Sequence, residues 1–342
     1  MSSEFPAISI LIPSFNQGAF IERTLLSILK QDYPGRVETI VADGGSTDST
    51  VEVLRKYADR IVWWSAKDRG FADAVMQAAE KATGDLLAIQ SSDDFYLAGA
   101  FMAAAAGFKR HPEVGFISGR DLGVDMSGRV VWLRRQGGQI TPRSLMFGHP
   151  IGQHATFMRR DIFEQVGGVR QNVDMCADLD LFYRASHVAP GRFIANHLGA
   201  YQVQPNQRTQ TSRRFCPSLR QMVESCEEDP FYNERFRLSE DEKRSLFTFW
   251  EISWTAVYDQ DEATRIARRL CPDIRSFDAR TQHTIRKYSC SWASRVFAGF
   301  ADGTLFASVS GRLLRRIAAP DTDWWHDQGV ATSGPEGRRG KW

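Results

Sequence analysis

The feature that most restricts the fold is a regular alternation of short apolar runs and helical repeats over the first 120 residues. Residues 7–13 (AISILIP) form an apolar run of strand length, and residues 20–31 repeat apolar side chains with helical spacing. The same pattern predicts strands over residues 37–42, 60–64, 85–90 and 114–118, and helices over residues 49–58, 71–82 and 98–110. Strands that alternate with helices predict an α/β fold, a mostly parallel sheet flanked by helices.

Two later stretches depart from this alternation. Residues 121–135 contain Ser127 and Gly128 between apolar segments, which predicts a hairpin and an antiparallel addition to the sheet. From about residue 207 the chain continues as long helical stretches, and residues 321–342 have no apolar periodicity. We therefore expect an α/β domain over residues 1–206, a helical C-terminal region over residues 207–320 and a disordered tail over residues 321–342.

Composition argues against several classes of protein. The 342 residues have 43 Lys and Arg against 41 Asp and Glu, and this balance gives no reason to expect a nucleic-acid partner. The five cysteines include no C-x-x-C pair, so we expect neither a disulfide framework nor a zinc site. The sequence contains neither a secretory signal nor a run long enough to span a bilayer, and we expect a cytoplasmic protein.

Polar residues follow each of the first four predicted strands, where ligands bind in open α/β sheets. These segments are PSFN at residues 13–16, DGGSTD at residues 43–48, DRG at residues 68–70 and SSDD at residues 91–94. A single Asp here could be a turn former or a helix cap, as we expect of Asp48 or Ser49, but three strand ends with carboxylates indicate a binding site. Adjacent Asp93 and Asp94 suit Mg²⁺ or Mn²⁺ shared with substrate phosphates.

The order and spacing of these motifs resemble family 2 glycosyltransferases of the GT-A fold, the Rossmann-like type found in bacterial surface-polysaccharide synthesis. Three segments carry the resemblance: PSFNQGAFIERTLLSIL from residue 13, VADGGSTDST from residue 41 and DRGFADAVMQAAEKATGDLLAIQSSDDFY from residue 68. The resemblance covers about residues 7–205. It implies a nucleotide-sugar donor such as a UDP-sugar, a divalent cation, and a glycan or lipid-linked acceptor.

The resemblance also implies a donor site built from residues at the strand ends. The residues expected to bind the nucleotide are Pro13, Ser14, Asn16, Asp43, Asp68, Gly70 and Asp93. Asp43 corresponds to a residue that contacts the base, and Asp68 and Gly70 to the loop along the ribose and diphosphate. The expected metal ligands are Asp94 and Asp93, with Ser92 at the first position of a D-x-D-type motif.

Asp178, in the segment ADLDL at residues 177–181, corresponds to the family's catalytic base. The implied reaction is a single displacement with inversion, in which the metal stabilises the leaving diphosphate and Asp178 deprotonates the acceptor hydroxyl. The alternative role for Asp178 is that of an acidic residue favoured at a helix start, which we expect of Asp180.

Three positions depart from the family pattern. Gly44 replaces the second Asp of a D-D-G-S-T-D motif, Met76 lies where a polar residue is common, and Gln204 replaces a His that reaches the metal or diphosphate. Arg208 could supply positive charge in its place. These changes keep open a second interpretation, a catalytically silent nucleotide-binding scaffold of a polysaccharide assembly complex. A nucleotidyltransferase would need a basic, Gly-rich loop where this chain has PSFN.

Three further features have competing interpretations. We expect His149 and His154 to be a structural pair rather than metal ligands, and Trp63 and Trp64 to pack rather than to stack on a base or sugar. Residues 285–319 carry six basic residues and one acid among apolar ones. This pattern favours equally a basic helix bound peripherally to the anionic cytosolic face of a membrane and a helix packed on the catalytic domain.

Overall fold

The computed structural model describes residues 5–134, 138–146, 151–173, 175–204, 207, 214–233 and 238–289. Its strands are β1 (Ile8–Ser14), β2 (Val37–Asp43), β3 (Val62–Ser65), β4 (Leu86–Ile89), β5 (Phe95–Tyr96), β6 (Phe116–Val124), β7 (Val130–Arg134), β8 (Gly138–Ile140), β9 (Thr156–Arg159) and β10 (Gly191–Gln202). Its helices are α1 (Ile21–Leu29), α2 (Thr50–Lys56), α3 (Phe71–Lys81), α4 (Ala100–Arg110), α5 (Pro142–Met146), α6 (Arg160–Gln165), α7 (Ala177–Val188), α8 (Phe215–Glu228), α9 (Pro230–Asn233), α10 (Glu240–Tyr258), α11 (Gln260–Leu270) and α12 (Ala279–Ser289), with 3-10 turns η1 (Gln153–Ala155) and η2 (Cys271–Ser276).

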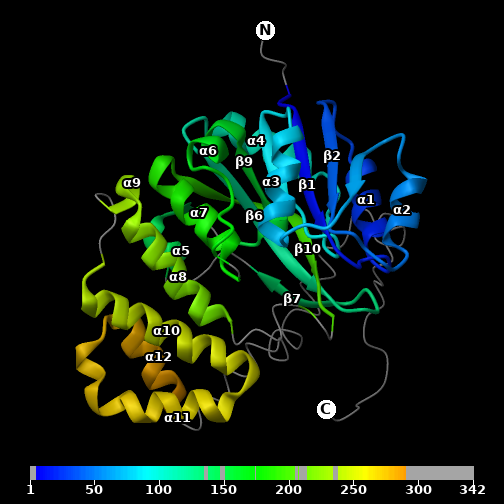
Figure 1. Cartoon of the computed structure of the whole chain (residues 1–342). Helices are drawn as coiled ribbons and strands as arrows, with labels where there is room; N and C mark the ends of the chain where they lie inside the picture. The colour runs from blue at the N-terminus through cyan, green and yellow to red at the C-terminus, as the bar shows by residue number, and fades with distance from the viewer. Residues whose placement is uncertain are drawn as a thin grey trace.

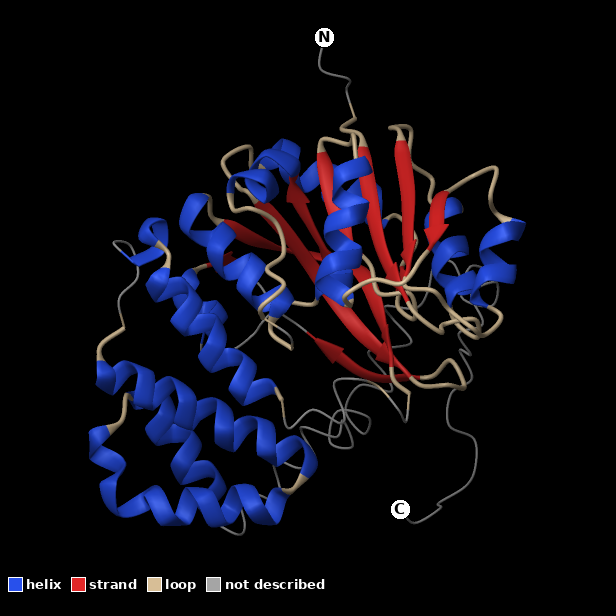
Figure 2. Ribbon diagram, in the orientation of Figure 1, coloured by secondary structure: helices blue, strands red, loops and turns tan. Residues whose placement is uncertain are grey.

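The described strands form one mixed sheet in the order β3-β2-β1-β4-β9-β6-β10-β5, with β7 on β6 and β8 on β10 (Figures 1 and 2). Strands β3, β2, β1 and β4 are parallel, as the sequence predicts. The predicted hairpin is confirmed, because β6 and β7 pair antiparallel around a turn in which Gly128 has a φ of 79°. The antiparallel strand β9, between β4 and β6, is an addition to the expected pattern, since four residues are too few to show strand alternation.

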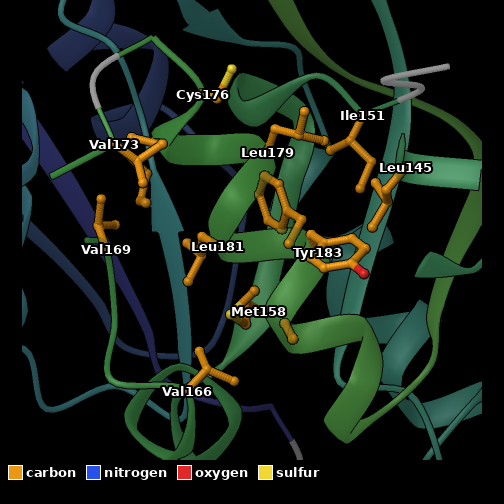
Figure 3. Close-up of a cluster of buried hydrophobic side chains, with 14 of the residues drawn as sticks. Leu145, Ile151, Met158, Val166, Val169, Val173, Cys176, Leu179, Leu181 and Tyr183 are labelled. Atoms are coloured by element: carbon orange, nitrogen blue, oxygen red, sulfur yellow. The ribbon is translucent and has the colours of Figure 1, made fainter. Parts of the chain in front are cut away.

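Alternate side chains of β1 enter two separate apolar cores, one on each face of the sheet. Leu11 belongs to a core with α3, α7 and α8, whereas Ile10 and Ile12 belong to a core with α1, α2 and α4. Figure 3 shows part of the first core, where side chains of α7 point toward Ile151 and Leu145. A strand covered on both faces is apolar throughout, which explains why its sequence lacks polar alternation.

Glu38 of β2 ties the starts of three neighbouring segments together. Its Oε2 accepts hydrogen bonds from Ser9 Oγ at 2.5 Å and from the Thr83 backbone N–H at 2.9 Å. Burial acts to raise the pKa of Glu38, but these hydrogen bonds and the charge of Arg36 lower it to about 2. The charged carboxylate therefore holds β1 and β2 to the turn that precedes β4.

The C-terminal helices pack in two groups. α8 and part of α10 complete the first core, where Phe215 stacks on Trp254 with ring centroids 4.1 Å apart. The rest of α10 forms a separate small core with α11 and α12, around Ile252, Ile266 and Ile285. Figure 1 shows these three helices at the lower left, beside α8 and away from the parallel strands. The boundary at residue 206 remains a prediction, and α8 beyond it shares the core of the sheet.

Part of the predicted basic segment is described, and part is not. Residues 285–289 end α12, with Ile285 in the small helical core. Residues 290–319 and the predicted tail at residues 321–342 lie outside the described residues. Among the helices that are described, none is both long and apolar enough to cross a membrane.

Candidate active site

The strand order marks the carboxyl ends of β1 and β4 as the binding edge. β1 lies between β2 and β4, and ligands bind in open α/β sheets where the order of strands reverses. The four polar segments singled out in the sequence follow β1, β2, β3 and β4. They therefore gather at one edge, which faces downward in Figure 1, on the side opposite the N-terminus.

Pro13 and Ser14 end β1, in register with Ala42 and Asp43 of β2. Ser14 is 5% exposed, and its carbonyl oxygen accepts the Gly44 N–H at 2.8 Å. Its side-chain hydroxyl is buried with no hydrogen-bond partner among the described residues. Buried hydroxyls are normally bonded, so this one is available to a ligand at the edge.

Asn16 joins the loop after β1 to the loop after β2. It has a φ of 53°, donates its N–H to Ser46 Oγ at 2.7 Å and accepts the Thr47 N–H on Oδ1 at 2.9 Å. Asp48, next in this loop, accepts the Thr50 N–H at the start of α2 at 2.9 Å, although the N-cap residue is Ser49, whose side chain makes no capping bond. Asn16 thus fixes the conformation of the loops after β1 and β2 relative to each other.

Asp43 is 1% exposed and is surrounded by donors from its own loop and from the end of β3. It accepts the backbone N–H groups of Gly45 and Ser46 at 3.2 and 2.9 Å, and the hydroxyls of Ser46 and Ser65 at 2.5 and 2.6 Å. Asp43 Oδ2 accepts three of these bonds and Oδ1 accepts one, so they use most of the acceptor capacity of the carboxylate. Asp43 therefore holds residues 44–46 in place at the edge.

Asp68 occupies the space beside Gly44. A Cβ atom on Gly44 would lie 2.9 Å from Asp68 Oδ2. Asp68 Oδ1 accepts the Gly70 N–H at 2.8 Å, and Gly70 adopts a φ of 106°, which favours glycine, just before α3 begins at Phe71. The carboxylate that the sequence motif lacks at position 44 is therefore replaced in space by one from the loop after β3.

α3 connects this edge to the segment that precedes α7. Asp73 accepts hydrogen bonds from Arg69 at 2.6 Å and from Gln171 at 3.1 Å, and the bond from Arg69 lowers the pKa of Asp73 to about 2. Met76 packs so closely on Gly168 that a Cβ there would lie 2.5 Å from its sulfur. Met76 is thus a packing residue for the turn before α7.

Asp93 and Asp94 follow β4 as an acid pair at the centre of the edge. Asp93 is partly exposed and accepts Gln204 Nε2 at 2.8 Å, whereas Asp94 is 3% exposed and accepts the Gln202 N–H at 2.9 Å. Burial raises the pKa of Asp93. Burial and the neighbouring charge of Asp93 raise the pKa of Asp94 to about 8.

This acid pair fits a divalent cation that is shared with substrate phosphates. Within the described residues, no group of three or more His, Cys, Asp or Glu could hold a metal ion by itself. Mg²⁺ is usually held by only one or two carboxylates together with phosphates, so Asp93 and Asp94 suffice. A cation between them would offset the burial and the repulsion that raise the pKa of Asp94.

Arg23 of α1 lies behind the acid pair, although no sequence motif singles it out. Its guanidinium lies 4.3 Å from the centre of the Phe95 ring and donates to the Asp93 backbone oxygen at 3.3 Å and to the Gln202 side chain. Burial lowers the pKa of Arg23, against the charges of Asp94 and Asp93. Arg23 thus joins the loop after β4 to the end of β10.

His154 adjoins the acid pair, and Asp121 lies on the other side of its imidazole ring. His154 Nδ1 lies 3.7 Å from Asp94 Oδ2, and its Nε2 lies 3.1 Å from Asp121 Oδ2. Burial acts to lower the pKa of His154, but the contacts with Asp121 and Asp94 raise it. The predicted partner of His154, His149, lies outside the described residues, as does Arg208.

Asp178 lies in the first turn of α7. α7 and β10 are joined by residues 189–190 and run in opposite directions, so the start of α7 lies toward the end of β10, where Gln202 contacts Asp94. Asp178 is partly exposed and accepts the Leu179 N–H at 2.8 Å. Asp180 is fully buried and paired with Arg184 at 2.7 Å, which makes it a structural residue.

Trp63 and Trp64 serve as packing residues. Trp63 packs on the core beneath α1, α2 and α4, and Trp64 packs on the opposite core. The Trp64 indole N–H donates to Gln77 Oε1 at 3.2 Å. The predicted packing role of both residues is confirmed.

A sheet in which β1 lies between β2 and β4, with an acid pair after β4, is the arrangement expected of a GT-A glycosyltransferase. The sequence profile of "Glycosyl transferase family 2" matches residues 9–167. The chain is 31% identical over 191 residues to an uncharacterized glycosyltransferase of Mycobacterium tuberculosis, covering 54% of this chain and 70% of that protein. It is 30% identical over 184 residues to a PGL/p-HBAD biosynthesis glycosyltransferase of Mycobacterium bovis, covering 52% and 69%. The chain belongs to glycosyl transferase family 2 and is a glycosyltransferase.

Solved structures share its fold. S. aureus TarS 1–349 in complex with UDP-GlcNAc matches with a TM-score of 0.57 at 16% identity, covering 87% of this chain and 92% of that one. The mannosyltransferase PcManGT from Pyrobaculum calidifontis, in complex with GDP-Man and Mn²⁺, matches with a TM-score of 0.56 at 18% identity, covering 90% and 88%. The expected GT-A fold is confirmed, and the interpretation as a silent scaffold is not favoured.

Proposed function

We propose that this glycosyltransferase moves a sugar from a nucleoside-diphosphate donor to a hydroxyl of a glycan or lipid-linked acceptor, with inversion at the anomeric carbon. The observation that carries the proposal is the acid pair, Asp93 and Asp94, which follows β4 at the binding edge and meets the end of β10 through the Gln202 N–H. The structural neighbours support the donor class, since TarS has been solved in complex with UDP-GlcNAc and PcManGT in complex with GDP-Man.

The donor would lie across the carboxyl ends of β1, β2 and β4. The unpartnered hydroxyl of Ser14 and the loop held by Asp43 and Asn16 would meet the nucleoside, with Asp68 and Gly70 along the ribose and diphosphate. Asp93 and Asp94 would hold Mg²⁺ or Mn²⁺, which when bound neutralises charge on the departing diphosphate. Unit charges about 4 Å apart interact by about 4 kcal/mol at an effective dielectric constant near 20, enough to assist departure.

Asp178 would act as the general base. It is partly exposed, so an acceptor hydroxyl can reach it, and the helix start together with the Leu179 N–H favours its charged form. A positioned base typically contributes about 10²–10⁴-fold to a rate. Inversion needs the base and the leaving group on opposite faces of the sugar. In this proposal Asp178 of α7 would lie on one face, and the diphosphate at the acid pair would lie on the other.

Substitution of Asp178 tests this role. Asp178→Asn is expected to reduce transfer at least 100-fold while the affinity for the nucleoside diphosphate stays within twofold of wild type. Asp241→Asn is the matched control, because Asp241 is an exposed acid in the first turn of α10. Transfer within tenfold of wild type in Asp178→Asn, or retained anomeric configuration in the product by NMR, would overturn the assignment.

A lipid-linked acceptor would be reached at the cytosolic face of a membrane, and the basic excess of residues 285–319 supports peripheral contact there. Flotation with vesicles rich in anionic lipid tests this contact. Replacing Arg312, Arg315 and Arg316 by Glu is expected to abolish flotation, whereas flotation equal to wild type would exclude the contact.

A further inference from the structure

Two carboxylates alternate with an imidazole and a guanidinium in a continuous row that begins at the acid pair: Asp94, His154, Asp121 and Arg134. We propose that His154, which lies 3.1 Å from Asp121, is a positioning residue that fixes the Asp94 carboxylate and thereby sets the affinity of the site for a divalent cation. The inference rests on the proposed function of the acid pair, and it gives His154 and Asp121 a role in that function.

The row is assembled from four separate segments of the chain, and three of its members are almost completely buried, whereas the Arg134 side chain is 35% exposed. His154 lies in η1, Asp121 in β6, Arg134 at the end of β7, and Asp94 in the loop after β4. The exposed fractions of Asp94, His154 and Asp121 are 3%, 5% and 0%. Arg134 NH1 lies 3.6 Å from the same Asp121 oxygen that faces His154. Buried carboxylates are costly unless they are paired, so Asp94 and Asp121 both depend on their basic neighbours.

Two glycines allow the row to close. A Cβ on Gly152 would lie 2.4 Å from Asp121 Oδ2 and 3.0 Å from His154 Cε1. A Cβ on Gly199 of β10 would lie 2.2 Å from the His154 backbone oxygen. Any larger residue at either position would displace His154 or Asp121. The close approach of the imidazole to both carboxylates is therefore built into the backbone around it.

The contacts of Asp94 leave part of its carboxylate for a cation. Its Oδ1 accepts the Gln202 N–H at 2.9 Å, and its Oδ2 faces His154 at 3.7 Å. The Tyr201 ring, 5.7 Å from the imidazole between centroids, limits how His154 can turn. Each oxygen of Asp94 thus has one neighbour. Because a carboxylate has about four lone-pair sites in total, the remaining sites can bind a cation. Such support behind a metal ligand typically changes metal affinity by about 10–100-fold.

A double-mutant cycle separates this positioning role from a merely structural one. We measure Mn²⁺ binding by electron paramagnetic resonance in the presence of UDP or GDP, whichever binds the wild-type chain. His154→Gln and Asp121→Asn are each expected to weaken Mn²⁺ binding by about 10–100-fold. In an Asp94→Asn background, His154→Gln is expected to cause no further loss, because His154 acts through Asp94. His111→Gln is the control, since His111 pairs only with Glu113 among the described residues.

Two results of this experiment would contradict the positioning role of His154. A folded His154→Gln variant with Mn²⁺ affinity within twofold of wild type would overturn the inference, as would an equal loss in the presence and absence of the Asp94 carboxylate. If circular dichroism shows that His154→Gln is unfolded, Asp121→Asn decides by the same criteria, because it keeps the size of the side chain. Failure of the wild-type chain to bind Mn²⁺ with either nucleotide would instead refute the proposed cation site itself.

Discussion

Replacing Arg184 by Met removes the cationic half of an ion pair whose side chains are both 0% exposed. Arg184 donates to Asp180 Oδ2 from Nε at 2.8 Å and from NH2 at 2.7 Å. It also donates to the backbone oxygens of Val166 and Gly168, in the turn that leads toward α7. The substitution therefore leaves one buried carboxylate and two buried carbonyl groups without these donors.

The expected loss of stability follows from these contacts. Removing one partner of a buried ion pair typically costs about 3–5 kcal/mol. Arg170 lies 3.5 Å from the other oxygen of Asp180 and keeps part of the compensating charge. We therefore expect the free energy of unfolding to fall by about 3 kcal/mol, at the lower end of that range. Urea denaturation followed by circular dichroism measures this difference.

A second variant tests whether the loss of stability comes from the unpaired carboxylate of Asp180. Replacing Asp180 by Leu together with Arg184→Met exchanges the ion pair for apolar side chains of similar volume. Such exchanges are often neutral or stabilising, so the double variant is expected to recover at least half of the loss. A single variant within about 1 kcal/mol of wild type, or a double variant less stable than the single one, would refute the reasoning.

Two further predictions concern the two ends of the sheet. The pKa of Glu38 is about 2 in the folded chain, against about 4.3 for an unperturbed Glu, so its carboxylate stabilises the fold above about pH 4.3 and this contribution is lost as the pH falls toward 2. Glu38→Gln should therefore lower the melting temperature at pH 7, with a gap from wild type that closes near pH 2; a constant gap would contradict this. Gly44→Ala would place a Cβ 2.9 Å from Asp68 Oδ2, and we expect at least fivefold weaker nucleoside-diphosphate binding by calorimetry, whereas unchanged binding would count against a role for Asp68.

The alternation of apolar runs and helical repeats was sufficient to predict the first half of the fold. β1 is buried on both faces, so its residues form one apolar run, and polar residues mark the point where the strand ends. β9 was not predicted, because its four residues have no periodicity and its position in the sheet depends on pairing with β4 and β6. α8 likewise follows the predicted domain boundary, but its apolar face packs in the core of the sheet, which sequence spacing cannot reveal.

The candidate site also has a part that the sequence predicts and a part that it does not. Asp68, Asp93 and Asp94 were predictable, because each follows a strand within a short motif. His154 and Asp121 were not predicted as neighbours of Asp94, because tertiary packing alone brings together η1, β6 and the loop after β4. No local pattern distinguishes a buried His between two carboxylates from any other His.

The most direct test of the account is a crystal structure of this glycosyltransferase with a nucleoside diphosphate and Mn²⁺. We predict the metal on Asp93 and Asp94, with the diphosphate bound to the metal and the base beside Ser14 and the loop at residues 44–46. The opposite edge of the sheet contains a cavity of about 370 Å³ lined in part by Asp85 and Arg159. A nucleotide bound in that cavity, with Mn²⁺ absent from the acid pair, would contradict the central claim.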